Sequence, residues 1–173
     1  MKKRYSGTLS TGDNNTVIAL SDTEVGKIFT GDTRSDIGSE ALKLQFANKV
    51  NSLLVHFIRL DELNDEAEML VMERLYPMDF RAYEYERREL WLDVFEDELR
   101  QLHKNGFVHR HLRRPSDMPG LTFDNIFLTP TGLRLIDVGI SALLEQVGER
   151  LFNRFVQQEL TEFEQFRSFF LSR

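Results

Sequence analysis

The hydrophobic pattern of this 173-residue chain changes its period once, between about residue 75 and residue 83. Up to that point, short β-prone runs alternate with polar turns, as in "RYSGTLS", "NTVIALS" and "EVGKIF". Beyond it, apolar residues recur at helical spacing through "YEYERRELWLDVFEDELRQLHKNG". A chain with its strands first and its long helices second is predicted to adopt an α+β fold.

The first 75 residues are predicted to form a five-stranded antiparallel sheet with one helix on it. Three strands precede the helical stretch "TRSDIGSEALKLQFANKV", which Ser35 or Asp36 is placed to cap. Two further strand-like runs, "SLLVHFIRL" and "AEMLVMERL", follow around the acidic turn "DELNDEAE". The predicted order is therefore three strands, a helix and two strands.

Residues 76–173 are predicted to be mainly helical. The first long helix is expected to end at Gly106, and its apolar positions are Leu90, Trp91, Val94, Phe95, Leu99 and Leu102. Short strand-like pieces follow in "FVHRHL", "NIFLT" and "LRLID". After Gly139 the whole pattern is helical, with an apolar stripe that is predicted to be core: Leu144, Val147, Leu151, Phe155, Phe163, Phe166 and Phe170.

The composition excludes several classes of function. With 41% hydrophobic residues the chain can bury a core of its own, and its formal charge of -6 argues against a nucleic-acid partner. No apolar run approaches the roughly 20 residues that span a membrane. Cysteine is absent, which excludes disulfides, thiolate metal sites and Cys nucleophiles. Since no signal peptide is recognisable, a cytoplasmic location is the simplest expectation, and delivery into another cell is compatible with it.

Several motifs come in a fixed order along the chain. "STGDNNTV", "VGKIF", the helix with Glu40 and "MLVMERL" are followed by "LHKNGFVHRHL", "FDNIFL" and "LRLIDVG". They resemble the phosphate loop, strand-three lysine, helix-C glutamate, hinge, catalytic loop and metal-binding segments of the protein kinase-like superfamily. The resemblance covers residues 5–140. It implies a two-lobed kinase-like fold, with an N-lobe over residues 1–75 and a reduced helical C-lobe over residues 76–173.

This resemblance also implies a site for ATP and Mg²⁺. Lys27, oriented by Glu40, would reach the α- and β-phosphates. Asn125 and Asp137 would supply the hard oxygen ligands that Mg²⁺ prefers. A phosphate loop that keeps only Gly12 and Val17 of its pattern would cover them. The adenine ring of ATP would contact the backbone of the hinge at Glu73, Arg74 and Leu75. Val17 and Val25 would form an apolar roof over the ring, and Phe127 would form the floor.

Two departures from the family pattern concern the catalytic loop. His111 stands where the family has the aspartate that accepts the proton of the attacking hydroxyl. Roughly nine extra residues, close to "RPSDMPGLT", separate that position from Asn125. Either His111, whose imidazole is a competent base near neutral pH, or Asp117 of the insertion would have to take the role.

A third departure leaves the function open. Only 34 residues follow Gly139, as in minimal kinase-like proteins such as RIO-type kinases and small bacterial effector kinases, which lack the peptide-docking platform. The chain is expected to be either an atypical phosphotransferase or a pseudokinase, a nucleotide-binding or protein-interaction module. A protein substrate or partner is compatible with both interpretations.

Overall fold

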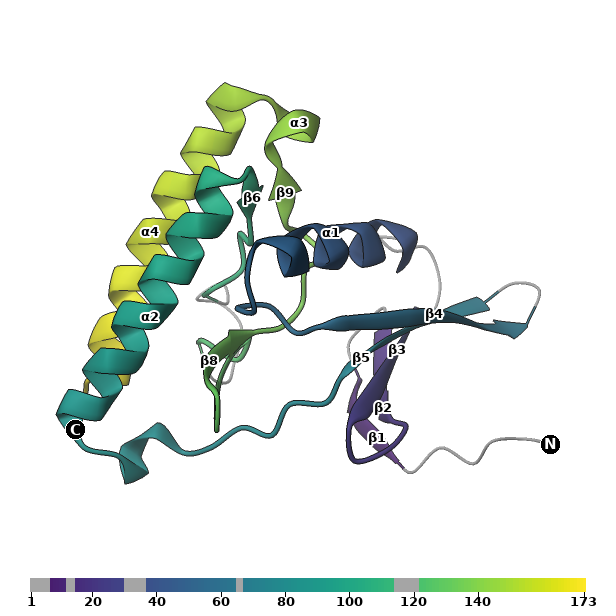
Figure 1. Cartoon of the computed structure of the whole chain (residues 1–173), viewed down its shortest axis with the longest axis horizontal. Helices are drawn as coiled ribbons and strands as arrows, with labels where there is room; N and C mark the ends of the chain where they lie inside the picture. The colour runs from purple at the N-terminus through teal and green to yellow at the C-terminus, as the bar shows by residue number, and fades with distance from the viewer. Residues whose placement is uncertain (1–6, 12–14, 30–36, 65–66, 114–121) are drawn as a thin grey trace.

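The computed structural model describes residues 7–11, 15–29, 37–64, 67–113 and 122–173. Its first part is a five-stranded antiparallel sheet with the helix α1 (Ile37–Val50) over one face (Figure 1). The order across the sheet is β1-β2-β3-β5-β4. The strands are β1 (Thr8–Thr11), β2 (Asn15–Ala19), β3 (Glu24–Phe29), β4 (Phe57–Asn64) and β5 (Ala67–Glu73). The predicted order of strands and helix is confirmed, whereas the proposed cap at Ser35 or Asp36 lies outside the described residues.

The two faces of this sheet bury different residues. On one face Lys27 of β3 stands between its register partners, Val17 on β2 and Leu70 on β5. The alternate residues of the same strands form a separate apolar cluster on the opposite face, because successive strand side chains point to opposite sides. That cluster contains Ile18, Met69 and Val71, with Leu20, Ile28 and Leu63 packed against it.

The second part is built around two long helices, α2 (Tyr85–Lys104) and α4 (Glu149–Phe170), which lie side by side and run in opposite directions (Figure 1). Aromatic side chains pack between them, as the rings of Phe95 and Phe163 stack at 5.7 Å between centroids. The remaining elements are short: a 3₁₀ turn η1 (Phe80–Ala82), β6 (Phe107–Val108), β7 (Ile126–Thr129), β8 (Gly132–Leu135), β9 (Ala142–Leu143) and α3 (Leu144–Val147).

Gly106 ends α2 as predicted. Its φ of +87° is in the left-handed region that glycine adopts without a steric penalty, and its N–H donates to the His103 carbonyl at 3.0 Å. The turn also directs the Gly106 carbonyl to the N–H of Leu144, at 2.8 Å. The helix end therefore leads directly into β6 and the loop that follows it.

The sequence prediction of a strand over "SLLVHFIRL" was wrong in its first half. Residues 53–55 precede β4 as a buried connection, and Leu53 and Leu54 are fully inaccessible to solvent. The backbone of this connection pairs with β8, because Val55 N–H donates to Leu135 O and Leu135 N–H donates to Leu53 O, both at 2.8 Å. Tertiary pairing with a distant strand therefore determined this local structure.

The helical prediction after Gly139 also needs correction. β9 precedes the helices and pairs with β6, a two-residue ladder too short to give a periodic signal. Leu144 and Leu151 are each 39% exposed, and on α2 Leu90 and Val94 are more exposed still. The buried face of α4 instead includes Phe152 and Glu159.

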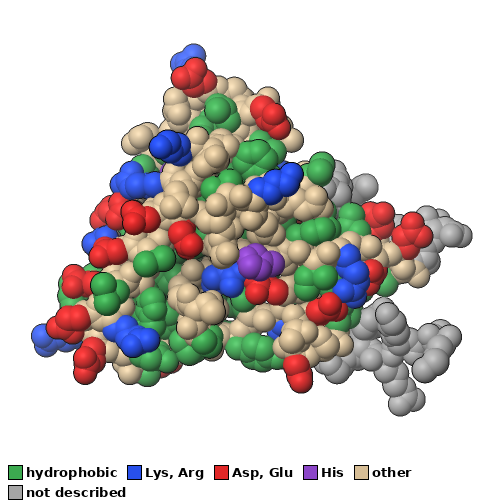
Figure 2. Space-filling view, viewed as in Figure 1, with side chains coloured by type: hydrophobic (Ala, Val, Ile, Leu, Met, Phe, Trp, Pro, Cys, Tyr) green, Lys and Arg blue, Asp and Glu red, His purple; other side chains and the backbone are tan. Residues whose placement is uncertain are grey.

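None of the helices in the described ranges is long and apolar enough to cross a membrane. On the face shown in Figure 2, acidic and basic side chains intermingle along the α2–α4 pair and form no large basic area there.

Candidate functional site

Lys27 and Glu40 form a buried ion pair between the sheet and α1. The Lys27 Nζ donates to both carboxylate oxygens of Glu40, at 3.2 and 3.1 Å. The two residues are only 5% and 2% exposed. Because a buried charge that loses its partner costs about 3–5 kcal/mol, this contact holds the ammonium group in one place. The structure thus brings together two residues that lie 13 positions apart in the sequence.

Asp137, which follows β8, adds a second carboxylate beside Lys27. Its Oδ1 lies 3.4 Å from Lys27 Nζ and accepts a hydrogen bond from the Gly139 N–H at 3.0 Å. The Asp137 φ of +61° is rare for a residue other than glycine and persists only where surrounding contacts enforce it. Burial acts to raise the pKa of the Asp137 carboxyl, but Lys27 and the Gly139 N–H together hold it below its usual value. The side chain is 37% exposed, so an ionised carboxylate remains accessible.

Asn125 lies at the same end of the β7–β8 hairpin as Asp137. The register pairs Ile126 with Leu135, and the Ile136 N–H donates to the Asn125 carbonyl at 3.0 Å. The Asn125 side-chain amide donates to the His111 carbonyl, also at 3.0 Å. Its amide oxygen accepts no hydrogen bond from the described residues. In the described part of the chain, no three His, Asp or Glu side chains gather in a metal-binding group.

His109 is a structural residue that joins the loop after β6 to the segment before Asp137. It is fully buried, with its Nε2 2.9 Å from the Ile136 carbonyl. Its Nδ1 accepts the His111 N–H at 3.2 Å. Since Nδ1 is the acceptor, Nε2 is the donor to the Ile136 carbonyl, so both ring nitrogens are occupied. This arrangement fixes the backbone of His111, whose side chain is partly exposed.

Glu159 of α4 is a buried site residue that the sequence analysis missed. Its side chain is 0% exposed. One carboxylate oxygen contacts His103 Nε2 at 2.5 Å and the His109 N–H at 3.4 Å. The other accepts the Arg110 N–H at 2.7 Å, and Arg110 has a positive φ of 70°. This carboxylate therefore holds the strained backbone immediately before His111. A charge at helical spacing within the α4 apolar stripe was the sequence signal that could have revealed it.

Glu162, one turn further along α4, extends the same support. Its carboxyl faces the backbone N–H groups of Leu112 and Arg113, which act to lower its pKa. Burial, followed by the negative charge of Glu159, raises the pKa of Glu162 to about 7. Its Oε2 is buried without a hydrogen-bond partner among the described residues. Two glutamates of one helix thus face consecutive backbone segments of the loop, and Glu159 holds the first of them by hydrogen bonds.

Replacing Glu162 by Gln should remove a pH dependence of stability. The pKa of Glu162, about 7 in the folded chain and 4.5 unfolded, means that the folded state binds more protons between these values. The wild type therefore loses stability as the pH rises through 7. At about pH 8 we expect the free energy of unfolding of Glu162→Gln to exceed that of the wild type by about 1 kcal/mol, a value reduced for the partial exposure of the side chain. Near pH 5 the two free energies of unfolding should be equal. Urea unfolding at both pH values, with Glu164→Gln as the exposed control, tests this. Parallel pH profiles for the wild type and Glu162→Gln would contradict it.

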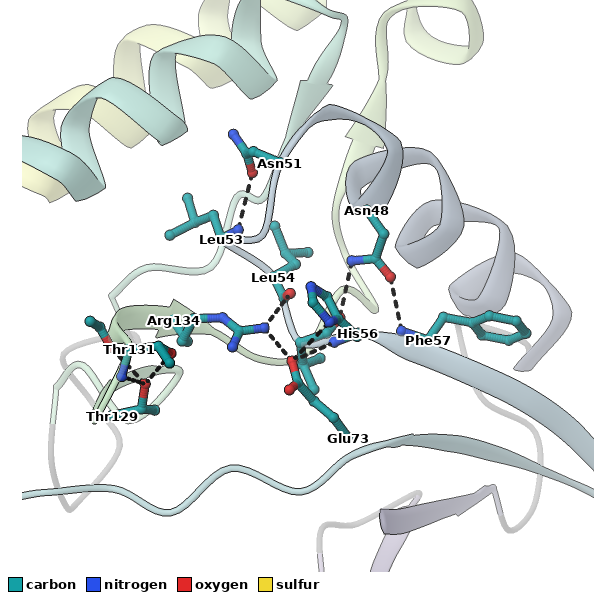
Figure 3. Close-up of polar contacts among 12 residues, drawn as sticks. Asn48, Asn51, Leu53, Leu54, His56, Phe57, Glu73, Thr129, Thr131 and Arg134 are labelled. Atoms are coloured by element: carbon teal, nitrogen blue, oxygen red, sulfur yellow. Dashed lines mark hydrogen bonds and ion pairs between the residues drawn. The ribbon is translucent and has the colours of Figure 1, made fainter. Parts of the chain in front are cut away.

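The predicted hinge residues begin with Glu73, the last residue of β5, and their polar groups are used unequally. The Glu73 N–H donates to His56 O, and the Arg74 N–H donates to Thr23 O. The Glu73 carboxylate pairs with Arg134 of β8, whose Nη2 also donates to Leu54 O at 3.0 Å (Figure 3). This network ties the end of β5 to β8.

Leu75 differs from its two predecessors in the predicted hinge. Its N–H donates no hydrogen bond to any described residue. Just beyond it, the Met78 N–H donates to Leu128 O at 2.7 Å, so the segment runs beside β7. Of the three predicted hinge residues, Leu75 is therefore the one whose backbone N–H can still donate a hydrogen bond to an acceptor outside the described residues.

The remaining predicted residues are distributed as follows. Val25 is buried and shares a row of the sheet with Ala19 and Met72, while Val17 is half-buried beside Lys27. Phe127 lies on β7, partly buried, next to the strand residue that receives the Met78 N–H. The predicted phosphate-loop residue Gly12 and the alternative base Asp117 lie outside the described residues.

Comparison with known proteins gives a match in structure alone. No protein-family model matches the chain, and no curated protein matches its sequence. Its structure is similar to that of the kinase PK-1 of Cydia pomonella granulovirus, with a TM-score of 0.58 and 15% identity. This chain has a protein kinase-like fold. The match covers 81% of this chain and 54% of PK-1, so this chain spans about half the length of PK-1.

Proposed function

We propose that this chain is an ATP- and Mg²⁺-dependent phosphotransferase of atypical kinase type, with a two-lobed fold and a reduced C-lobe. The observation that carries the proposal is the position of Lys27. A buried ammonium group is held by Glu40 at 3.1 Å and lies 3.4 Å from the accessible carboxylate of Asp137. A cation fixed beside a potential metal ligand is the arrangement that phosphoryl transfer requires, because catalysis there rests on positioning and charge.

The oxygen groups of Asn125 and Asp137, at one end of the β7–β8 hairpin, support the proposal of a hard cation beside Lys27. Asn125 offers an amide oxygen and Asp137 a carboxylate whose pKa is held low, and both are ligand types that Mg²⁺ takes. When bound, ATP supplies the phosphoryl group and Mg²⁺ offsets its charge. Lys27 would orient the phosphates of ATP, and the Leu75 N–H would donate a hydrogen bond to its adenine ring.

His111 is the described residue proposed to accept the proton of the acceptor hydroxyl. Its backbone is fixed from both sides, by His109 Nδ1 and by the Asn125 amide. A neutral imidazole can accept a proton from a hydroxyl group. Asp117, in the insertion, is the alternative carboxylate proposed for this role.

A pseudokinase is the second candidate function, and the histidine at position 111 favours it. A histidine replaces the carboxylate that normally accepts the proton, while the groups proposed for nucleotide binding are kept. Under this interpretation a bound nucleotide stabilises a surface for a protein partner. Wild-type protein that binds ATP but does not consume it would favour this candidate.

Replacing Lys27 by Met should abolish stabilisation by nucleotide. Because a ligand that binds only the folded state raises the melting temperature by mass action, millimolar ATP with Mg²⁺ should raise that of the wild type by about 5 °C or more. The variant should show no ATP-dependent increase, although its own melting temperature will be lower because Glu40 loses its partner.

The matched control is Lys49→Met, which removes an exposed lysine from the same helix that carries Glu40. It should keep the full ATP-dependent shift. An equal shift in wild type and Lys27→Met would contradict the site assignment, and the absence of a shift in the wild type would contradict nucleotide binding.

A further inference from the structure

A groove lies on the N-terminal half of α4, which is the upper end of that helix in Figure 1. It has a volume of about 470 Å³. Its lining among the described residues combines polar, basic and apolar side chains and includes no carboxylate: Arg150, Leu151, Asn153, Arg154, Phe155, Gln157 and Gln158. In a chain with a formal charge of -6, a groove of this composition is a local exception.

The two arginines of this groove differ from many others in the chain. Arg59, Arg100 and Arg134 are paired with carboxylates. Arg150 and Arg154, exposed and one helical turn apart, make no ion pair or hydrogen bond with the described residues. Their guanidinium groups therefore keep their full capacity to bind carboxylates in pairs.

Arg110 connects the groove to the proposed site of transfer. Its guanidinium lies 3.7 Å from the centre of the Phe155 ring, which lines the groove. Its Nη1 donates to the Ile140 carbonyl at 3.2 Å, three residues after Asp137. Arg110 directly precedes His111 in the chain, so the loop that carries the proposed base contacts one of the residues that line the groove. Ile140 and Leu151, 47% and 39% exposed, add apolar surface along this path.

We propose that this groove binds the phosphate acceptor, and that the acceptor is a polypeptide segment rich in Asp or Glu. This inference rests on the proposed function, because it names the substrate class of the same site. Charge complementarity selects the occupant: two unpaired arginines attract carboxylates, and the amides and apolar groups can contact a peptide backbone and side chains. A lipid surface or a nucleic acid would present phosphates instead and is an alternative that the test must separate.

The test uses the whole chain without nucleotide and three fluorescent probe peptides. The first alternates Glu with Ser, the second replaces Glu by Gln, and the third replaces Glu by Lys. By anisotropy, the acidic peptide should bind at least about tenfold more tightly than the other two, and less tightly as salt rises. Arg150→Glu/Arg154→Glu should weaken this binding at least about tenfold. The control Lys49→Glu/Arg87→Glu, with the same change in charge at exposed positions away from the groove, should change it less than about twofold.

Several outcomes would overturn the proposal. They are equal binding of the acidic and Gln peptides, equal losses in the two double variants, or preferential binding of anionic vesicles or RNA through Arg150 and Arg154. Because the peptides are measured without ATP, the proposed function fails separately, in the ATP-dependent thermal shift. That shift should be unchanged in Arg150→Glu/Arg154→Glu, since neither arginine belongs to the proposed nucleotide site.

Discussion

Asp137→Asn should weaken Mg²⁺-dependent nucleotide binding by roughly 100-fold or more, the largest functional effect that we expect. The substitution keeps the shape of the side chain and an oxygen able to accept the Gly139 N–H, but it removes the negative charge. A divalent cation held by the Asn125 amide alone would lose its charged protein ligand. Binding of ATP with Mg²⁺ and with EDTA, measured by calorimetry, would show the difference.

The control for this prediction is Asp93→Asn on α2, where the carboxylate is 66% exposed. It should bind ATP and Mg²⁺ as the wild type does. If Asp137→Asn kept the Mg²⁺ dependence, Asp137 would not be a metal ligand and the proposed site would have to be abandoned.

Glu159→Ala should cause the largest loss of stability. It would leave the buried N–H of His109 and the partly buried N–H of Arg110 without their acceptor, and would remove the partner of His103. Leaving buried donors unpaired and removing one member of a buried charged contact costs about 3–5 kcal/mol, which corresponds to a fall of about 10 °C in melting temperature. Thermal and urea unfolding followed by circular dichroism would measure both.

Glu164→Ala, an exposed position on the same helix, provides the comparison and should change stability by less than about 0.5 kcal/mol. Glu159→Gln should fall between the two, because an amide retains one acceptor oxygen but presents donors where the carboxylate had a second acceptor. Equal stability of Glu159→Ala and Glu164→Ala would show that the carboxylate does not hold the loop.

The candidate site shows where sequence patterns lose their predictive power. Lys27 and Glu40 were singled out through ordered motifs, and the structure places them in contact. Glu159 was overlooked because its neighbours, Phe155 and Phe163, indicate a core helix, and no local signal says which distant backbone a buried carboxylate will meet. Residues 53–55 were assigned to a strand for a related reason, since their pairing partner is Leu135.

The sequence alone determined the order of strands and helix in the first 75 residues and the end of α2 at Gly106, because hydrophobic period and helix-end signals act between neighbouring residues. Only the tertiary structure decided which face of α4 is buried and which carboxylates hold the loop before His111. It also left Arg150 and Arg154 without partners among the described residues. These outcomes depend on contacts between residues tens of positions apart, and the free energy of burying a charge is set by the partners that the fold brings to it.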